Sequence, residues 1–84
     1  MNKRLYIVSA VDEGNLQVRL VFNDGTESVV DVGDFIHRHP HPQYNKYLDP
    51  ARFRSFKIEG GNIVWGRNWD LIFPIEQLYA GYLE

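Results

Sequence analysis

Three histidines occupy alternate positions in the run His-Arg-His-Pro-His-Pro that begins at residue 37. In extended backbone, alternate side chains project to the same side, so three imidazoles could hold a zinc or nickel ion and leave a fourth position open. The two prolines oppose this arrangement, because polyproline II backbone has a period of three and turns the imidazoles apart. Two interpretations follow: a metal site built from His37, His39 and His41, or an exposed loop that faces a partner.

The carboxylates and hydroxyls are not spaced for catalysis. Acid–base chemistry needs two carboxylates that face each other across a cleft, and no motif in the sequence implies such a pair. Helix capping explains Asp34 and Asp49, and a turn explains Asp70. The serines lack a nucleophile elbow, the glycines do not form a phosphate loop, and without cysteine there is no thiolate chemistry. We therefore expect no enzymatic activity and no cofactor.

The two tryptophans stand in different local patterns. Trp65 belongs to an alternating strand pattern opposite another aromatic residue, which predicts a place in the core. Trp69 follows Gly66-Arg67-Asn68, a turn sequence. Its indole is therefore expected either in the core or at the surface, where it would anchor a protein interface.

Charge is uneven along the 84 residues, although the net charge is only -2. Residues 37–67 hold six Lys or Arg against two acids, and the remainder holds three against nine. A basic segment favours an acidic partner or phosphate, and the alternative is a solvated face of a mixed-charge protein. The overall negative charge and the aromatic residues expected in the core argue against direct nucleic-acid binding. The chain contains no apolar run long enough for a signal peptide or a membrane span, so we expect a cytoplasmic protein.

The elements that must position these residues begin with antiparallel strands. Apolar residues alternate over 5–11 and again over 16–22. A two-residue turn at Glu13-Gly14 would place Ile7 opposite Leu20 on one face. The same register pairs Val11 with Leu16 and Leu5 with Phe22.

A third strand is predicted over 26–32, after the reversal Asn23-Asp24-Gly25. A three-residue loop with Gly25 in the left-handed conformation sets Val18 opposite Val30 and keeps the apolar face continuous. Between Gly33 and Asp49 the pattern dissolves into a long connection. Connections of this length in a small domain are commonly functional or mobile.

The second half of the chain predicts one turn of helix, a second hairpin and a final helix. Asp49-Pro50 has the residues of a helix start. A turn at Gly60-Gly61 places Ile58 opposite Ile63 and Phe56 opposite Trp65. The final amphipathic helix starts after Pro74 and carries an apolar stripe formed by Ile75, Leu78, Tyr79 and Tyr82. The sequence thus predicts one α+β domain over residues 1–84, with an antiparallel sheet of about five strands and short helices.

Several motifs, taken in order, resemble the bacterial domain-of-unknown-function family numbered 2442 (DUF2442). They are Phe22-Asn23-Asp24-Gly25, Val30-Asp31-Val32, Tyr47-Leu48-Asp49-Pro50-Ala51-Arg52-Phe53, Ile63-Val64-Trp65-Gly66, Asp70-Leu71 and Leu78-Tyr79. The resemblance implies an α+β fold of hairpins and short helices, and it brings no catalytic residues. It also implies a role beside a second small domain, in an arrangement similar to toxin and antitoxin pairs. Two features depart from the family pattern: Gly66 stands where a proline is usual, and the His-Pro run has no counterpart.

The residues and the resemblance together favour a non-enzymatic interaction module, accessory or antitoxin-like, whose partner is another small bacterial protein. A homo-oligomer is compatible with the same features, and no membrane partner is expected. The alternative is a metal-binding or metal-sensing protein that uses the three histidines. We expect the partner-binding residues to be His39, His41, Tyr44, Arg67 and Trp69.

Overall fold

The computed structural model describes residues 4–84, which form two three-stranded antiparallel sheets and short helices. The first sheet has the order β1–β2–β3 and the second β4–β5–β6. The strands are β1 (Ile7–Gly14), β2 (Gln17–Phe22), β3 (Glu27–Asp31), β4 (Lys57–Glu59), β5 (Asn62–Trp65) and β6 (Leu71–Ile72). The helices are α1 (Val32–Arg38), α2 (Pro42–Asn45), the 3₁₀ turn η1 (Lys46–Leu48), α3 (Pro50–Phe53) and α4 (Ile75–Ala80). The α+β class is confirmed.

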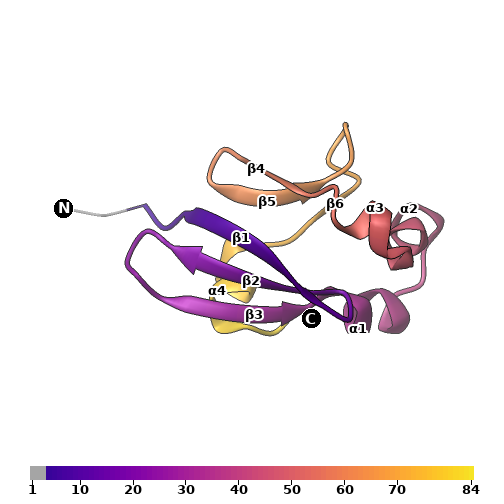
Figure 1. Ribbon diagram of the computed structural model, residues 1–84, viewed down its shortest axis with the longest axis horizontal. Helices are drawn as coiled ribbons and strands as arrows, with labels where there is room; N and C mark the ends of the chain where they lie inside the picture. Colours follow the sequence, from indigo (N-terminus) through magenta and orange to yellow (C-terminus); the bar gives the residue numbers. More distant parts are fainter. Residues whose placement is uncertain (1–3) are drawn as a thin grey trace.

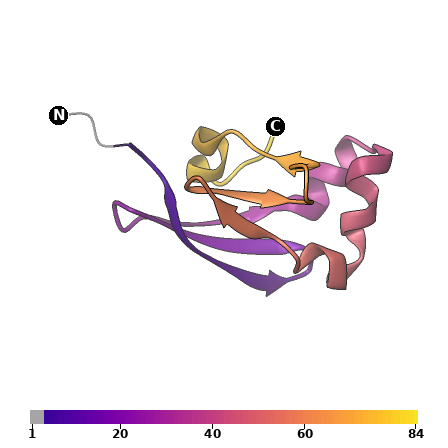
Figure 2. The same cartoon turned by 90° about the horizontal axis from the view of Figure 1, so that it is seen from above.

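The predicted single sheet of about five strands is wrong, because the connection between β3 and β4 is helical and separates the two hairpins. The helices α1, α2 and α3 gather at one end of both sheets (Figure 1). In the view from above, the second sheet crosses over the first (Figure 2). Among residues 4–84, a backbone hydrogen bond of 2.8 Å joins Ile7 N at the start of β1 to the carbonyl oxygen of Gly61 in the β4–β5 turn. The sheets therefore share a core rather than a continuous ladder of hydrogen bonds.

The predicted register of the first hairpin is wrong. Ile7 lies opposite Phe22, and Leu20 lies opposite Ala10. The turn falls at Asn15 and Leu16, whose φ angles are 54° and 61°, and β1 carries register shifts at both of its ends. The later turn leaves Leu16 out of the ladder, where its carbonyl oxygen accepts the N–H groups of the first two residues of α1. An alternating apolar pattern cannot predict that Leu16 bonds to α1 instead of pairing across the hairpin.

The second turn follows the prediction. Val18 lies opposite Val30, and Gly25 has a φ of 86°. Val18, Leu20 and Phe22 of β2 are all buried, so the middle strand presents a continuous apolar row to the core.

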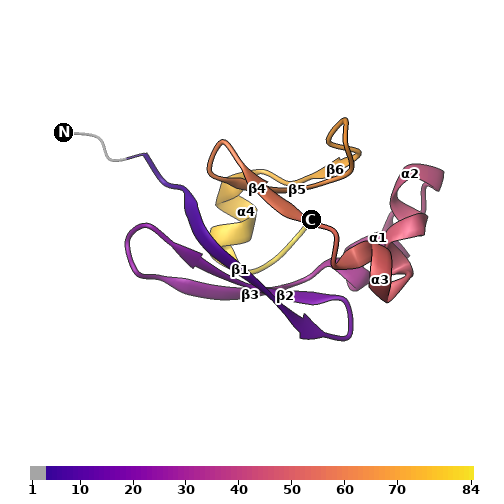
Figure 3. The ribbon, with the colours of Figure 1, turned by 45° about the horizontal axis from the view of Figure 1, so that its top comes forward.

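The connection expected between Gly33 and Asp49 as a loop is mostly helical (Figure 3). Asp31, not Asp34, caps α1, because its Oδ1 accepts the N–H of Asp34 at 2.9 Å. The cap predicted at Asp49 is confirmed, since its Oδ2 accepts the N–H of Arg52 at 3.3 Å. Short capped turns in succession hide a helical period that would need a longer stretch to be recognised.

One core cluster joins both sheets and the helices. Trp65 is fully buried, and its indole N–H donates to the carbonyl of Phe53 at 2.8 Å. The predicted pairing of Ile58 with Ile63 is confirmed, and the rings of Phe56 and Trp65 lie 5.9 Å apart between centroids.

The apolar stripe predicted for α4 is only partly right. Leu78 is buried, whereas Tyr79 and Tyr82 are 37% and 59% exposed. The helix ends at Ala80, and Gly81 follows with a φ of 83°, so Tyr82 lies outside the helical period. Tyr79 lies with its ring edge against Phe22 and donates its hydroxyl to Asp24 Oδ2 at 2.7 Å.

Candidate functional site

The turn between β5 and β6, residues 66–70, holds an exposed tryptophan and is called here the aromatic loop. Trp69 is 49% exposed and has a φ of 56°, in the left-handed region that bulky side chains rarely adopt. The interpretation of Trp69 as a core residue is therefore wrong. A left-handed non-glycine residue costs on the order of 1 to 3 kcal/mol, so the surrounding contacts must hold it in place.

Asp70 forms the inner anchor of the aromatic loop. Its Oδ2 accepts the ammonium of Lys46 at 2.8 Å and the hydroxyl of Tyr47 at 3.4 Å. Gly66 allows this approach, since a Cβ at that position would lie 2.7 Å from Asp70 Oδ2 and 2.8 Å from Tyr47 Oη. The loop is thereby attached to η1.

The anchor sets the direction of three pKa shifts. The hydrogen bond from Lys46 holds the pKa of Asp70 below its ordinary value, and the same bond raises the pKa of Lys46. Burial raises the pKa of Tyr47, because surroundings that exclude water disfavour the charged phenolate. At neutral pH the anchor is therefore a charged Lys46–Asp70 pair beside a neutral phenol.

The outer anchor lies on the second sheet. Along β5, Ile63 and Trp65 belong to the core cluster, so Val64 between them faces the other way. Its cross-strand partner Lys57 shares that outer face, and so does Glu59 two residues farther along β4. The two charged side chains form an ion pair of 2.8 Å there.

Trp69 reaches this outer face through its indole N–H, which donates to Glu59 Oε2 at 2.7 Å. Glu59 belongs to β4, and β5 separates β4 from β6, so the bond carries the indole across β5. Val64 has 0% exposure although it lies outside the main core cluster, as expected if the indole covers it. Hydrogen bonds from Lys57 and Trp69 lower the pKa of Glu59, which keeps this acceptor ionised. The indole is thus held at its N–H, while about half of the side chain stays open to solvent.

Apolar and cationic groups flank the open indole. Ile72 pairs with Val64 on the same face and is 41% exposed. Arg67 is exposed in the aromatic loop itself, and among residues 4–84 no ion pair includes it. The loop therefore offers an aromatic plane, an aliphatic neighbour and an available guanidinium.

The structure does not assemble the histidine metal site. His41 caps α2, because its Nδ1 accepts the N–H of Gln43 at 3.1 Å. His39 follows α1 and places Nε2 2.7 Å from the carbonyl oxygen of Glu84. His37 lies within α1 and is exposed. Across the described residues 4–84, no group of three or more His, Cys, Asp or Glu is placed to hold a metal ion.

The predicted partner-binding residues fall into two groups. Arg67 and Trp69 share the aromatic loop, whereas His39 and Tyr44 lie around Phe35, with ring centroids 4.8 Å and 5.9 Å from it. The rings of His41 and Tyr44 lie with centroids 5.1 Å apart and are tilted by 40°. No local sequence pattern indicated the Lys46–Asp70 anchor, and the close approach at Gly66 is seen only in the folded chain.

Comparisons with known protein families, with curated proteins and with solved structures found no match. Membership of DUF2442 therefore stays a prediction. In residues 4–84, no helix has both the length and the apolar character needed to cross a membrane.

Proposed function

We propose that this protein is a non-enzymatic interaction module that binds another small protein through the aromatic loop. The observation that carries the proposal is Trp69: a strained, half-exposed tryptophan anchored by the contacts of Asp70 and by Glu59. Strained backbone that contacts over-determine is a feature of binding sites, where the strain fixes a side chain in its working position.

Pre-organisation explains why such an arrangement favours binding. A tryptophan that is already fixed loses little conformational entropy when a partner covers it. Tryptophan is also among the residues that contribute most to interface energies, especially at the centre of a patch with an apolar neighbour. Ile72 supplies that neighbour, and Arg67 supplies a donor at the rim.

The charge around the loop favours a partner whose surface carries acidic groups next to an apolar side chain. Residues 37–67 carry a net charge of +4, and both carboxylates nearest the indole, Glu59 and Asp70, are already paired with lysines. Single-stranded nucleic acid fits less well, because stacking of successive bases needs several open aromatic faces. These features fit an accessory or antitoxin-like protein of the cytoplasm whose partner is a small bacterial protein.

Capture of the partner from a native extract tests the proposal. Wild-type protein and the variants Trp69→Ala and Tyr82→Ala are compared, with nuclease and with chelator added in parallel samples. We expect one stoichiometric small protein on the wild type and on Tyr82→Ala, at least tenfold less on Trp69→Ala, and no effect of either additive. Tyr82 is the matched control because it is an aromatic residue with 59% exposure outside the loop.

The proposal fails if Trp69→Ala captures the same protein as the wild type while circular dichroism shows an unchanged fold. It also fails if retention disappears with nuclease, which indicates nucleic acid, or with chelator, which indicates metal. Recovery of the chain itself as the captured protein would identify a homo-oligomer instead.

A further inference from the structure

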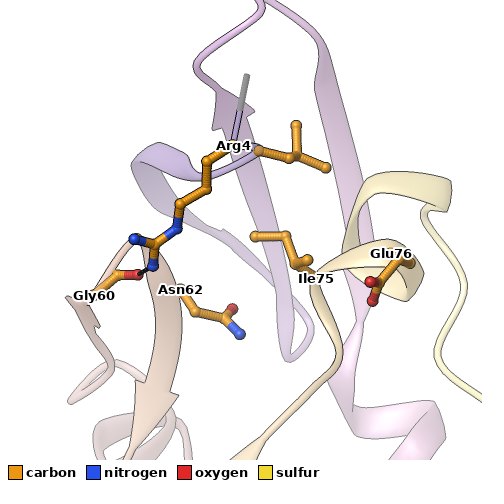
Figure 4. Close-up of a pocket in the computed structure, with 7 residues that line it drawn as sticks. Arg4, Gly60, Asn62, Ile75 and Glu76 are labelled. Carbon is orange, nitrogen blue, oxygen red and sulfur yellow. Dashed lines mark hydrogen bonds between the residues drawn. The ribbon is translucent and has the colours of Figure 1, made fainter. Parts of the chain in front are cut away.

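A pocket of about 460 Å³ lies away from the aromatic loop, where three segments distant in sequence meet. Its walls come from the residues that precede β1, from the turn between β4 and β5, and from the first turn of α4 (Figure 4). The lining residues are Arg4, Leu5, Gly60, Gly61, Asn62, Ile75 and Glu76. This volume lies within the range of small-molecule sites in proteins.

Hydrogen bonds fix the wall that carries Arg4. The Arg4 carbonyl accepts the side-chain amide of Asn23 at 2.9 Å, and its guanidinium donates to the carbonyl of Gly60 at 2.8 Å. One residue on, a Cβ at Gly61 would lie 2.6 Å from the Cβ of Tyr6, so the turn and the chain before β1 are closely packed. The guanidinium is therefore held at the pocket with further N–H groups to donate.

Asn62 belongs to the wall rather than to the recognition groups. Its amide donates to the carbonyl of Phe73 at 2.9 Å, and its Oδ1 accepts the N–H of Ile63 at 2.7 Å. The side chain thus joins the β4–β5 turn to the segment that leads into α4. The pocket is formed by contacts that exist without a ligand.

The ionisable groups of the lining have opposite charge. Glu76, in the first turn of α4, has neither a side-chain hydrogen bond nor an ion pair among residues 4–84, and it lies across the pocket from Arg4 (Figure 4). Leu5 and Ile75 are the apolar members of the lining. One cationic group, one anionic group and an aliphatic surface thus share one concave site.

We propose that this pocket binds a small zwitterion with an aliphatic side chain, either a free amino acid or a short peptide with free termini. A carboxylate accepts from Arg4, an ammonium donates to Glu76, and the side chain covers Leu5 and Ile75. A simple anion is disfavoured by Glu76, and a simple cation by Arg4. The inference does not depend on the aromatic loop, because the two sites share no lining residue.

Titration of ¹⁵N-labelled protein tests the site. Leucine, dileucine and trileucine are each added while amide shifts are followed, with N-acetyl-leucine and leucine amide as the matched ligands that lack one charge. We expect saturable shifts at residues 60–62 and 75–76 with at least one zwitterion, and affinities at least tenfold lower for both blocked ligands. The best length among the three separates a free amino acid from a peptide.

Two substitutions sharpen the result. Glu76→Lys is expected to remove the preference for the zwitterion, because the site then carries two cationic groups. N-acetyl-leucine should bind this variant better than leucine amide and at least as well as the zwitterion. Arg4→Gln is expected to reduce zwitterion affinity at least tenfold, whereas Arg67→Gln leaves it unchanged. The inference is overturned if no zwitterion gives saturable shifts, if the blocked ligands bind equally well, or if Glu76→Lys leaves the selectivity as it was.

Discussion

Among residues 4–84, two bulky residues adopt left-handed backbone, and one side chain packs against the core while the other is exposed. Leu16, at the β1–β2 turn, packs against the core cluster, and its carbonyl accepts the N–H groups of Val32 and Gly33. Trp69, at the β5–β6 turn, stays 49% exposed. Both φ angles are close to 60°, so the local cost of each conformation is similar.

The difference shows what each strained turn achieves. At Leu16, burial of the side chain and two backbone hydrogen bonds offset the strain, so folding alone explains the conformation. At Trp69, the conformation is held by Asp70 and Glu59, and a large apolar surface remains open. That open surface is the one that the proposed binding role uses.

The largest expected effect comes from breaking the inner anchor with Gly66→Ala. The new Cβ meets Asp70 and Tyr47 at less than 3 Å, and the residue has a φ of 87°. We expect a loss of about 2 to 4 kcal/mol in the free energy of unfolding, measured by urea denaturation. Gly25→Ala is the matched control: its φ is 86° with open space around it, so only about 1 kcal/mol should be lost. Equal losses in the two variants would show that the anchor is not tightly packed.

Leu16→Ala tests the other strained turn. Removal of a partly buried side chain is expected to lower the free energy of unfolding by about 2 kcal/mol, since three carbon groups leave the core. Thermal or urea denaturation measures the change. A loss of less than about 0.5 kcal/mol would mean that packing does not offset the strain at Leu16.

Trp69→Ala is expected to change the free energy of unfolding by less than about 1 kcal/mol, because half of the side chain is already in water. The same urea series measures it. A loss of about 3 kcal/mol or more, typical of a core tryptophan, would place Trp69 in the same class as Leu16.

The smallest effect is a pH dependence carried by Asp70. Its pKa is lowered in the folded state, so its contribution is present above its ordinary value of 3.8 and is lost as pH falls through the folded value. Asp70→Asn should therefore be less stable than the wild type at pH 7, and the two should converge in acid. Denaturation between pH 2 and about 7 measures the difference in free energy of unfolding between the two proteins. A difference that stays constant with pH would contradict the ionised Lys46–Asp70 anchor.

The fold was predictable where local pattern and turn chemistry agree. Gly25 and Gly60-Gly61 set the registers of two hairpins, and Asp49 set the start of α3. The register prediction for the first hairpin failed because Leu16 takes a conformation that favours glycine. Packing against the core and hydrogen bonds from α1 stabilise that conformation, and neither is visible in a local pattern. The division into two sheets was equally hidden, since it depends on the helical turns of the connection.

The candidate site shows the same limit. Trp69 and Arg67 were identifiable as neighbours in a turn, but the side on which the indole lies depends on Glu59, ten residues earlier. The anchor at Asp70 joins residues 23 and 24 positions apart. Such contacts between distant residues are fixed by the assembled structure rather than by a local period.

Fluorine NMR of protein labelled with 5-fluorotryptophan shows whether the Trp69 indole is open to solvent in the free protein. Its two resonances are assigned through Trp69→Phe, and each is compared in H₂O and D₂O, because only a solvent-exposed fluorine shows a solvent isotope shift. We expect a clear shift for Trp69, which is 49% exposed, and none for Trp65, which is fully buried. Absence of the shift from both resonances would show that Trp69 is covered in the free protein, and the aromatic loop would then not be an open binding surface.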